Sequence, residues 1–307
     1  MKTRALLASV LGFCAWACVN LYADPAHAAP PFADIYQRVT NEFVEACFFK
    51  PAEAKTNELA FTLAPLILQE VTRAAEPLAR PDRFGTLSLS NGLLALDCSR
   101  PAIYWQANTV RLIGKEHVRF AYVWCYSPGA AGQGESALGL QGIRITLNSA
   151  GQPMVWEVLA DSSGAELIFV SQSLEAAALA EFGKALPARR YAIERGVEET
   201  PNVVVARVID DGPVAMGPFV YLSAGTRVGS ALICRCMPAQ ARKLLATGIY
   251  DLVPFQSGST TPLIAQARAL SNERTAFWPG GSTGEERLEK CLRLPGAFSG
   301  AQGTTAR

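Results

Sequence analysis

The sequence feature that most constrains the fold is a run of short apolar segments from Thr86 to Leu159, each with the length or alternation of a β-strand. The segments TLSLS and LLALD flank Asn91 and Gly92, which tolerate the positive φ angles of a two-residue hairpin turn. A second hairpin connection is expected at residues 148–151, between ITL and MVWEV. This region therefore predicts a series of antiparallel strands.

Other segments add further strands and several helices. The strands expected after this region span residues 166–170, 202–209, 219–222 and 229–236. Helices are expected at residues 32–48, 173–184, 239–247 and 285–292. In these segments apolar residues recur at steps of three and four, or follow a capping residue or a proline. Residues 59–71 fit a strand interrupted at Pro65 or a helix that begins there, and we favour the strand.

Together these patterns predict an α+β fold, in which a predominantly antiparallel sheet carries a few flanking helices and is stabilised by disulfides. Residues 29–294 are expected to form a single domain, because no internal repeat or low-complexity linker divides them. Residues 295–307, PGAFSGAQGTTAR, are rich in small and turn-forming residues. We expect them to form a flexible C-terminal tail.

The first 28 residues have the three parts of a secretory signal peptide. Lys2 and Arg4 precede an apolar run from Ala5 to Leu21, and Ala26-His27-Ala28 provides small residues for a signal peptidase. We expect cleavage before Ala29 and an exported mature protein, either periplasmic or extracellular. An uncleaved membrane anchor is the alternative, but the apolar run is short for a bilayer core of about 30 Å and is followed at once by Asp24 and Pro25. No membrane span is expected after cleavage.

Removal of the signal changes the charge balance. It takes Lys2, Arg4 and Asp24 from the 28 basic and 27 acidic residues, so the mature chain keeps 26 of each and has a formal net charge of zero. Without a basic field to release counterions from phosphates, the protein is not expected to bind nucleic acid. His117 is then the one histidine left, so a histidine-rich zinc site is not expected, nor is any cofactor.

Six cysteines remain in the mature chain: Cys47, Cys98, Cys125, Cys234, Cys236 and Cys291. An even number of cysteines in an exported protein favours structural disulfides over thiolate metal sites. Cys98 and Cys125 each end a strand-rich segment, so we expect them to bond to each other. Cys234 and Cys236 would then bond to Cys47 and Cys291, which are expected on helices.

The pair Cys234-Arg235-Cys236 also has a redox interpretation. It lies where a strand is expected to meet a helix that begins at Pro238, and a helix N-terminus beside an arginine stabilises a thiolate. The spacing is one residue shorter than the C-x-x-C of redox proteins, and a direct bond between the two cysteines would close a strained ring. We therefore favour structural disulfides.

Four aromatic side chains alternate along one expected strand and so share one of its faces: Phe120, Tyr122, Trp124 and Tyr126. Such a face can stack on sugar rings, which makes Tyr122 and Trp124 candidate ligand-binding residues, but core packing explains it equally well and is favoured. The opposite face is then the expected solvent side, and it carries Arg119, Ala121 and Val123.

Asp210 and Asp211 end another expected strand and are the remaining candidate ligand-binding residues. Two neighbouring carboxylates could hold a calcium ion or act as an acid and base. Adjacent side chains diverge at the end of a strand, however, and Asp-Gly-Pro is ordinary turn chemistry. We favour the turn, and predict no metal site.

Three further patterns are set aside. The segment from Gly280 to Gly284 matches G-x-S-x-G, but no buried strand precedes it and no histidine follows it, as a nucleophile elbow requires. Gly132-Gln133-Gly134 is followed by a strand-like segment, whereas a dinucleotide site needs a helix there. His117 lies in the polar link GKEH and is expected to be a surface turn residue.

These features favour an exported, non-catalytic binding or envelope-associated protein whose partner is a glycan or another envelope component. No catalytic residue is predicted, and enzymatic activity is left open. Two alternatives remain. A secreted hydrolase would have to use carboxylates such as Asp210, Asp211, Glu157 and Asp161, because histidines are so few. A thiol-disulfide redox protein would use Cys234 and Cys236.

Overall fold

The computed structural model describes residues 42–52, 58–71, 84–90, 93–126, 139–158, 166–224, 229–235, 240–255 and 285–300. All belong to one compact unit, residues 31–307. They form a mostly β structure in which a mixed sheet curls into a nearly closed barrel. The predicted α+β fold with a predominantly antiparallel, disulfide-stabilised sheet is therefore wrong. No described helix is long and apolar enough to cross a bilayer; the signal segment, residues 1–28, lies outside the described residues.

The described part of the chain contains thirteen strands and a few short helices. In chain order the elements are β1 (Glu42–Pro51), α2 (Leu59–Thr62), β2 (Leu66–Glu70), β3 (Phe84–Ser90), β4 (Leu93–Asp97), β5 (Ala102–Leu112), β6 (Lys115–Tyr126), β7 (Gly139–Leu147), β8 (Pro153–Val158), β9 (Glu166–Ser171), α3 (Gln172–Phe182), β10 (Val203–Ile209), β11 (Phe219–Leu222), β12 (Gly229–Ile233), β13 (Gln240–Pro254), α5 (Glu285–Cys291) and the 3-10 turn η3 (Gly296–Ser299).

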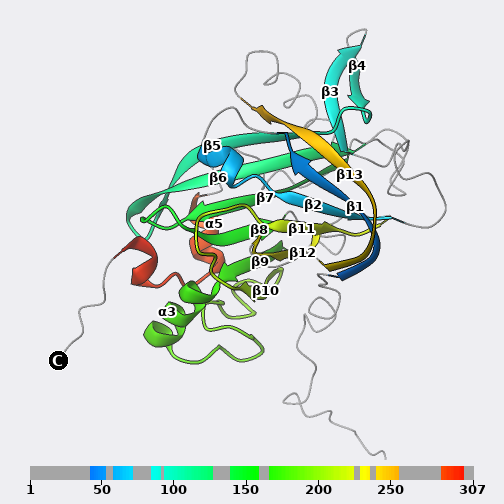
Figure 1. Ribbon diagram of the computed structural model, residues 1–307. Coiled ribbons are helices and arrows are strands. Elements are labelled where there is room, and N and C mark those ends of the chain that lie inside the picture. The colour runs from blue at the N-terminus through cyan, green and yellow to red at the C-terminus, as the bar shows by residue number, and fades with distance from the viewer. Residues whose placement is uncertain are drawn as a thin grey trace, which may run out of the picture. The chain divides into compact units, whose positions relative to one another are not determined.

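Neighbouring strands follow the order β10-β9-β8-β7-β6-β5-β13-β1-β2-β11-β12, and β3 and β4 branch from β6 (Figure 1). The pairs β1·β13, β2·β11, β5·β13 and β9·β10 are parallel, whereas the others are antiparallel. Residues of both end strands share one apolar cluster, Val204 and Ala206 from β10 and Leu232 from β12. The two ends of the path therefore enclose a common interior.

The predicted series of strands after Thr86 is confirmed. Ser90 pairs with Leu93, as the Asn91-Gly92 hairpin requires, although the two turn residues lie outside the described part. β5 and β6 form a further two-residue hairpin that the sequence analysis missed. Its turn residues, Ile113 and Gly114, have φ angles of 47° and 73°, the positive values of a type I′ turn.

The helices predicted at residues 32–48 and 239–247 are wrong where the structure describes them, because residues 42–48 belong to strand β1 and residues 240–247 to strand β13. Residues 32–41 and 239 lie outside the described part. The two strands pair in parallel along most of β1, and β13 then continues to pair with β5. β13 therefore joins the two halves of the sheet. For residues 59–71, the structure has a short helix followed by a strand, α2 and β2.

The interior of the barrel holds the largest apolar cluster, which includes the aromatic stripe of β6. α2 and the turn after it pack onto this cluster through Ala60, Leu63 and Ala64. Tyr122 Oη donates a hydrogen bond to the carbonyl oxygen of Ala60 at 2.8 Å. Tyr250 Oη likewise donates to the carbonyl oxygen of Pro65 at 2.6 Å. The first bond satisfies a carbonyl group that the short helix leaves open, and the second satisfies a carbonyl group of the turn after it.

Gly217 also holds this turn in place. Its N–H donates to the carbonyl oxygen of Thr62 at 2.8 Å. A Cβ at this position would lie 2.2 Å from the carbonyl oxygen of Leu63 and 2.3 Å from that of Ala64. Only glycine therefore allows the chain after β10 to approach α2 so closely.

The outer face of the central strands is also buried. Arg119, Ala121 and Val123 of β6 were expected to face solvent, but they are 2%, 2% and 5% exposed. Two apolar clusters cover this face: one contains side chains of α3, α5 and η3, and the other contains Tyr104, Val123 and Phe255. The expectation of a solvent side on β6 is therefore wrong.

Four buried charged side chains lie on the neighbouring strands β6, β7, β8 and β9: Arg119, Arg144, Glu157 and Glu166. Arg144 Nη2 donates a short hydrogen bond to Glu157 Oε1 and lies 3.8 Å from Glu166 Oε1. Arg119 Nε donates to Thr146 Oγ1 at 3.1 Å and lies 3.9 Å from Glu157 Oε2. Buried charges are tolerated only when they are paired, and the two arginines balance the two glutamates.

No disulfide joins any two of the described cysteines, Cys47, Cys98, Cys125, Cys234 and Cys291. The predicted Cys98–Cys125 bond is therefore wrong, as is stabilisation by disulfides among these residues. Cys47 lies on a strand instead of the expected helix, and Cys236 lies outside the described residues. The apolar clusters that contain Cys47, Cys125, Cys234 and Cys291 stabilise the fold instead.

His117 is a buried residue of β6, 2% exposed, so its prediction as a surface turn residue is wrong. Its ring stacks on Phe298 of η3 with centroids 4.6 Å apart. Nδ1 lies 3.1 Å from the carbonyl oxygen of Leu147, and Nε2 lies 3.3 Å from Ser299 Oγ. The beginning of the predicted C-terminal tail is thus packed against the sheet. Residues 301–307 lie outside the described part.

Protonation of His117 should destabilise this packing. Burial lowers the pKa of the imidazole, and the Lys115 ammonium acts in the same direction. A lowered native pKa means that the contribution of His117 is complete above the unfolded pKa of about 6.5 and is lost as the pH falls through the native pKa. The His117→Gln variant should therefore lose less unfolding free energy between pH 8 and pH 5 than the wild-type protein, as measured by urea titrations. Equal losses in the two proteins would contradict this role.

Candidate functional site

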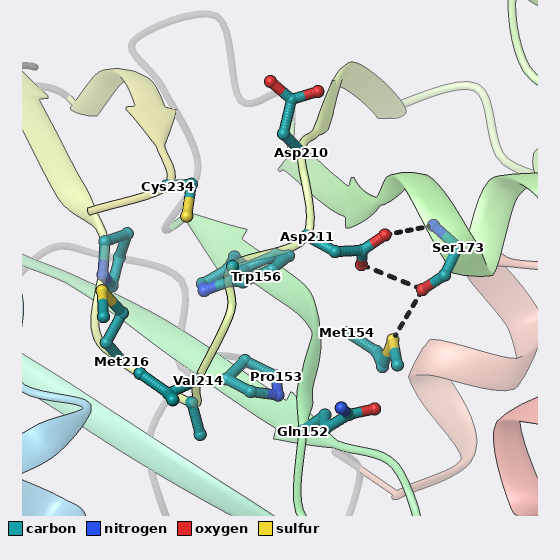
Figure 2. Close-up of a pocket in the computed structure, with 13 residues that line it drawn as sticks. Gln152, Pro153, Met154, Trp156, Ser173, Asp210, Asp211, Val214, Met216 and Cys234 are labelled. Carbon is teal, nitrogen blue, oxygen red and sulfur yellow. Dashed lines mark hydrogen bonds between the residues drawn. The ribbon is translucent and has the colours of Figure 1, made fainter. Parts of the chain in front are cut away.

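A pocket of about 270 Å³ lies beside the end strands of the sheet. Its walls come from β8, from the first turn of α3, from residues 210–218 after β10, and from Cys234 after β12 (Figure 2). β10 and β12 are the two ends of the strand path, and in the described part of the chain they do not pair with each other. The incomplete closure of the barrel thus places loop and strand residues around a small cavity.

The lining is largely apolar and contains the indole ring of Trp156, which lies among the other lining side chains in Figure 2. Met154, Met216 and Val214 supply further apolar surface. Trp156 is 6% exposed, and its cross-strand neighbours are Ile145 and Phe169. Its Nε1 has no hydrogen-bond partner among the described residues. A buried indole N–H normally finds an acceptor, so this donor is an exception that calls for a cause.

Asp211 supplies the polar side of the pocket. Its Oδ2 accepts a hydrogen bond from the backbone N–H of Ser173 at 2.9 Å, and its Oδ1 accepts from Ser173 Oγ at 2.9 Å (Figure 2). Ser171 caps the same helix by accepting from the N–H of Leu174. Asp211 therefore holds the first turn of α3 against the loop after β10, where the helix dipole favours a negative charge.

Asp210 points away from Asp211 and is exposed (Figure 2). The two carboxylates are not aimed at a common point, as expected for adjacent residues at the end of a strand. With Asp211 occupied as a helix cap, they do not form an acid and base pair. Glu157, another carboxylate that the hydrolase alternative would use, is buried beside Arg144, and Asp161 lies outside the described residues.

The segment Cys234-Arg235 has two separate roles. Cys234 is buried and its side chain lines the pocket. Arg235 donates to the carbonyl oxygens of Thr62, at 3.4 Å, and of Ala64, through a short hydrogen bond. Burial lowers the pKa of Arg235, while the nearby Tyr250 and Tyr122 act in the opposite direction. The expected helix at Pro238 is absent, since β13 begins at Gln240, so a helix N-terminus at residue 238 is not available to activate a thiolate.

The other two candidate ligand-binding residues lie in the core. Tyr122 and Trp124 are fully buried, at 0% exposure, inside the barrel. Trp124 Nε1 donates to Tyr126 Oη at 2.9 Å, so both the ring and the polar atom of Trp124 are satisfied internally. Neither side chain offers a surface on which a sugar could stack.

Sequence reasoning missed Trp156, Met154 and Met216. Asp210 and Asp211 were singled out because neighbouring carboxylates are visible in a sequence. The pocket, in contrast, is formed by β8 and the loop before β11, and only the order of strands in the sheet brings these two segments together. The one available signal was Trp156 in the strand MVWEV, since tryptophan is the residue whose donor most needs a partner when buried.

Comparisons of the chain with protein-family models, with curated proteins and with solved structures find no match. The chemistry of the pocket is therefore inferred from its own residues.

Proposed function

We propose that this chain is an exported, non-catalytic binding protein, and that its ligand occupies the pocket beside Trp156. The observation that carries the proposal is Trp156, a residue of the pocket lining whose buried indole N–H has no acceptor among the described residues. A ligand oxygen or nitrogen would satisfy this donor. Ligand sites are typically apolar cavities with a few polar groups that fix orientation, and this pocket fits that description.

The size of the pocket restricts the ligand. About 270 Å³ lies close to the lower limit of about 300 Å³ for small-molecule sites, so we propose a small molecule as the ligand. The aromatic stripe proposed as a glycan platform is buried, so the pocket replaces Tyr122 and Trp124 as the ligand site. A glycan or other envelope component would have to enter with a small apolar group.

The binding proposal is favoured over the two enzymatic alternatives. Asp211 caps α3 and Asp210 diverges from it, so the described carboxylates of the pocket do not converge on a bond to be cleaved. Cys234 is 8% exposed, and thiol exchange requires access to the sulfur.

The indole resonance of Trp156 provides the test. In ¹H–¹⁵N spectra, Trp156→Phe identifies this resonance by its loss. Acetophenone, an apolar probe with one acceptor, should shift it in a saturable manner, whereas ethylbenzene has the same shape without the oxygen and should shift it less. Trp105, which does not line the pocket, gives the internal control. The absence of any saturable shift with either compound would contradict a small-molecule site at Trp156.

Export is the second part of the proposal, and it is supported by the tripartite pattern of residues 1–28. When the full chain is expressed in a bacterial host, protein recovered from the exported fraction should begin at or near Ala29. Ala28→Asp should slow processing, because the peptidase pocket accepts small residues at this position. Exported protein that still begins at Met1 would overturn the predicted cleavage.

A further inference from the structure

The charge of the pocket lining gives further information on the ligand class. The lining contains two carboxylates, Asp210 and Asp211, and no basic residue is among the described residues that form it. The basic residue next to Cys234 in the chain, Arg235, directs its guanidinium to the carbonyl oxygens of Thr62 and Ala64 instead. An anionic ligand would therefore meet the negative charge of Asp211 without a compensating basic side chain among the described lining residues.

Trp156 adds an independent preference. The face of an indole ring carries the negative part of its quadrupole, and tryptophan is the aromatic residue that attracts cations most strongly. The positive edge of the same ring bears the N–H that lacks an acceptor among the described residues. The ring thus combines a face that attracts cations with an edge that can donate to an oxygen.

The acidic residues alone would not define a site. Both oxygens of Asp211 already accept hydrogen bonds from Ser173, and the α3 N-terminus offsets part of its charge. A carboxylate oxygen has two lone pairs, however, so each can accept a further hydrogen bond. The donor of Trp156, which has no partner in the described part of the chain and belongs to a side chain that is 6% exposed, is the second observation that points to a ligand here.

We propose that the pocket binds a small organic cation that also carries a hydrogen-bond acceptor, with the cation near Asp211 and the face of Trp156 and the acceptor at the indole N–H. Met154, Met216 and Val214 provide apolar and polarisable surface for the carbon groups around the charge. This inference rests on the proposed function, since it assigns a ligand class to the same pocket.

Choline and 3,3-dimethylbutan-1-ol provide a matched pair of probes, because they have the same shape and hydroxyl group and differ in the positive charge. Choline should bind about tenfold more tightly, judged by titration of the Trp156 indole resonance. Sodium chloride should weaken the binding of choline and leave that of the neutral alcohol unchanged, because salt screens only the charged ligand.

Two variants refine the test. Asp211→Asn keeps an oxygen acceptor for Ser173 and should reduce the preference for choline to about threefold or less. Trp156→Leu should abolish the preference; because this variant has no Trp156 indole resonance, its binding is followed by the backbone amide resonances of the pocket residues Val214 and Ser173. If Asp211→Asn fails to fold, the salt titration of the wild-type protein decides. Equal or tighter binding of the neutral alcohol would overturn the cation proposal and leave the proposed binding function intact. No response to either probe, or to acetophenone, would overturn both.

Discussion

Trp124→Ala is expected to lower the free energy of unfolding by about 3–5 kcal/mol, the usual cost of removing a large buried aromatic side chain. Trp124 is fully buried in the interior of the barrel, and the alanine would leave a cavity that closely packed neighbours cannot fill. Its hydrogen bond to Tyr126 would also be lost. Urea denaturation followed by circular dichroism measures the change.

Two control variants separate the causes. Trp124→Phe keeps an aromatic ring and loses the hydrogen bond from Nε1, so it should cost clearly less than alanine. Val118 lies on the same strand, but its side chain is 41% exposed. Val118→Ala should therefore lower the free energy of unfolding by less than about 1 kcal/mol. A stable Trp124→Ala protein would mean that this face of β6 is not the core of the barrel.

The sequence predicted strands well where the signals were local. Asn91-Gly92 and residues 148–151 are hairpin connections whose backbone requirements depend on a few adjacent residues. The helix at residues 173–184 was also predicted to within two residues of α3, because capping serines and apolar spacing are local features. None of these signals depends on the order of strands in the sheet.

β1 was mistaken for a helix for a specific physical reason. The register of the β1·β13 pair shifts between Ala46 and Cys47, where Leu245 of β13 has no counterpart in β1. Residues Phe43, Ala46, Cys47 and Phe49 are all buried, and their spacing of three, one and two residues imitates the steps of an amphipathic helix. The extra residue of this pair lies in β13, some 200 residues away in the chain, so the sequence of β1 alone does not reveal the shift.

The outer face of the sheet was misjudged for a related reason. Alternation of Arg119, Ala121 and Val123 with aromatic residues is typical of a strand with one solvent face. In the structure α3, α5 and η3 belong to an apolar cluster on this side, and the charges of Arg119 and Arg144 are balanced by Glu157 and Glu166. Polar residues in a strand indicate solvent only when no other layer covers them.

This buried charge cluster is the source of the second large effect. Arg144→Met should lower the free energy of unfolding by about 3–5 kcal/mol, because Glu157 would lose its closest cation in a site from which water is excluded. Methionine has a similar volume, so the loss would come mainly from charge and not from a cavity. Urea denaturation at pH 7 again measures the change.

The double variant Arg144→Met with Glu157→Leu tests this explanation. Replacing both partners of a buried ion pair by apolar residues is often neutral or stabilising, so the double variant should recover most of the stability lost by Arg144→Met alone. The interaction energy from the double-mutant cycle should then reach about 2 kcal/mol or more. Arg119 and Glu166, which lie within 4 Å of the pair, would remain and keep the cluster neutral. A double variant that is no more stable than Arg144→Met would show that the charge of Glu157 does not cause the loss, and that packing around Arg144 does.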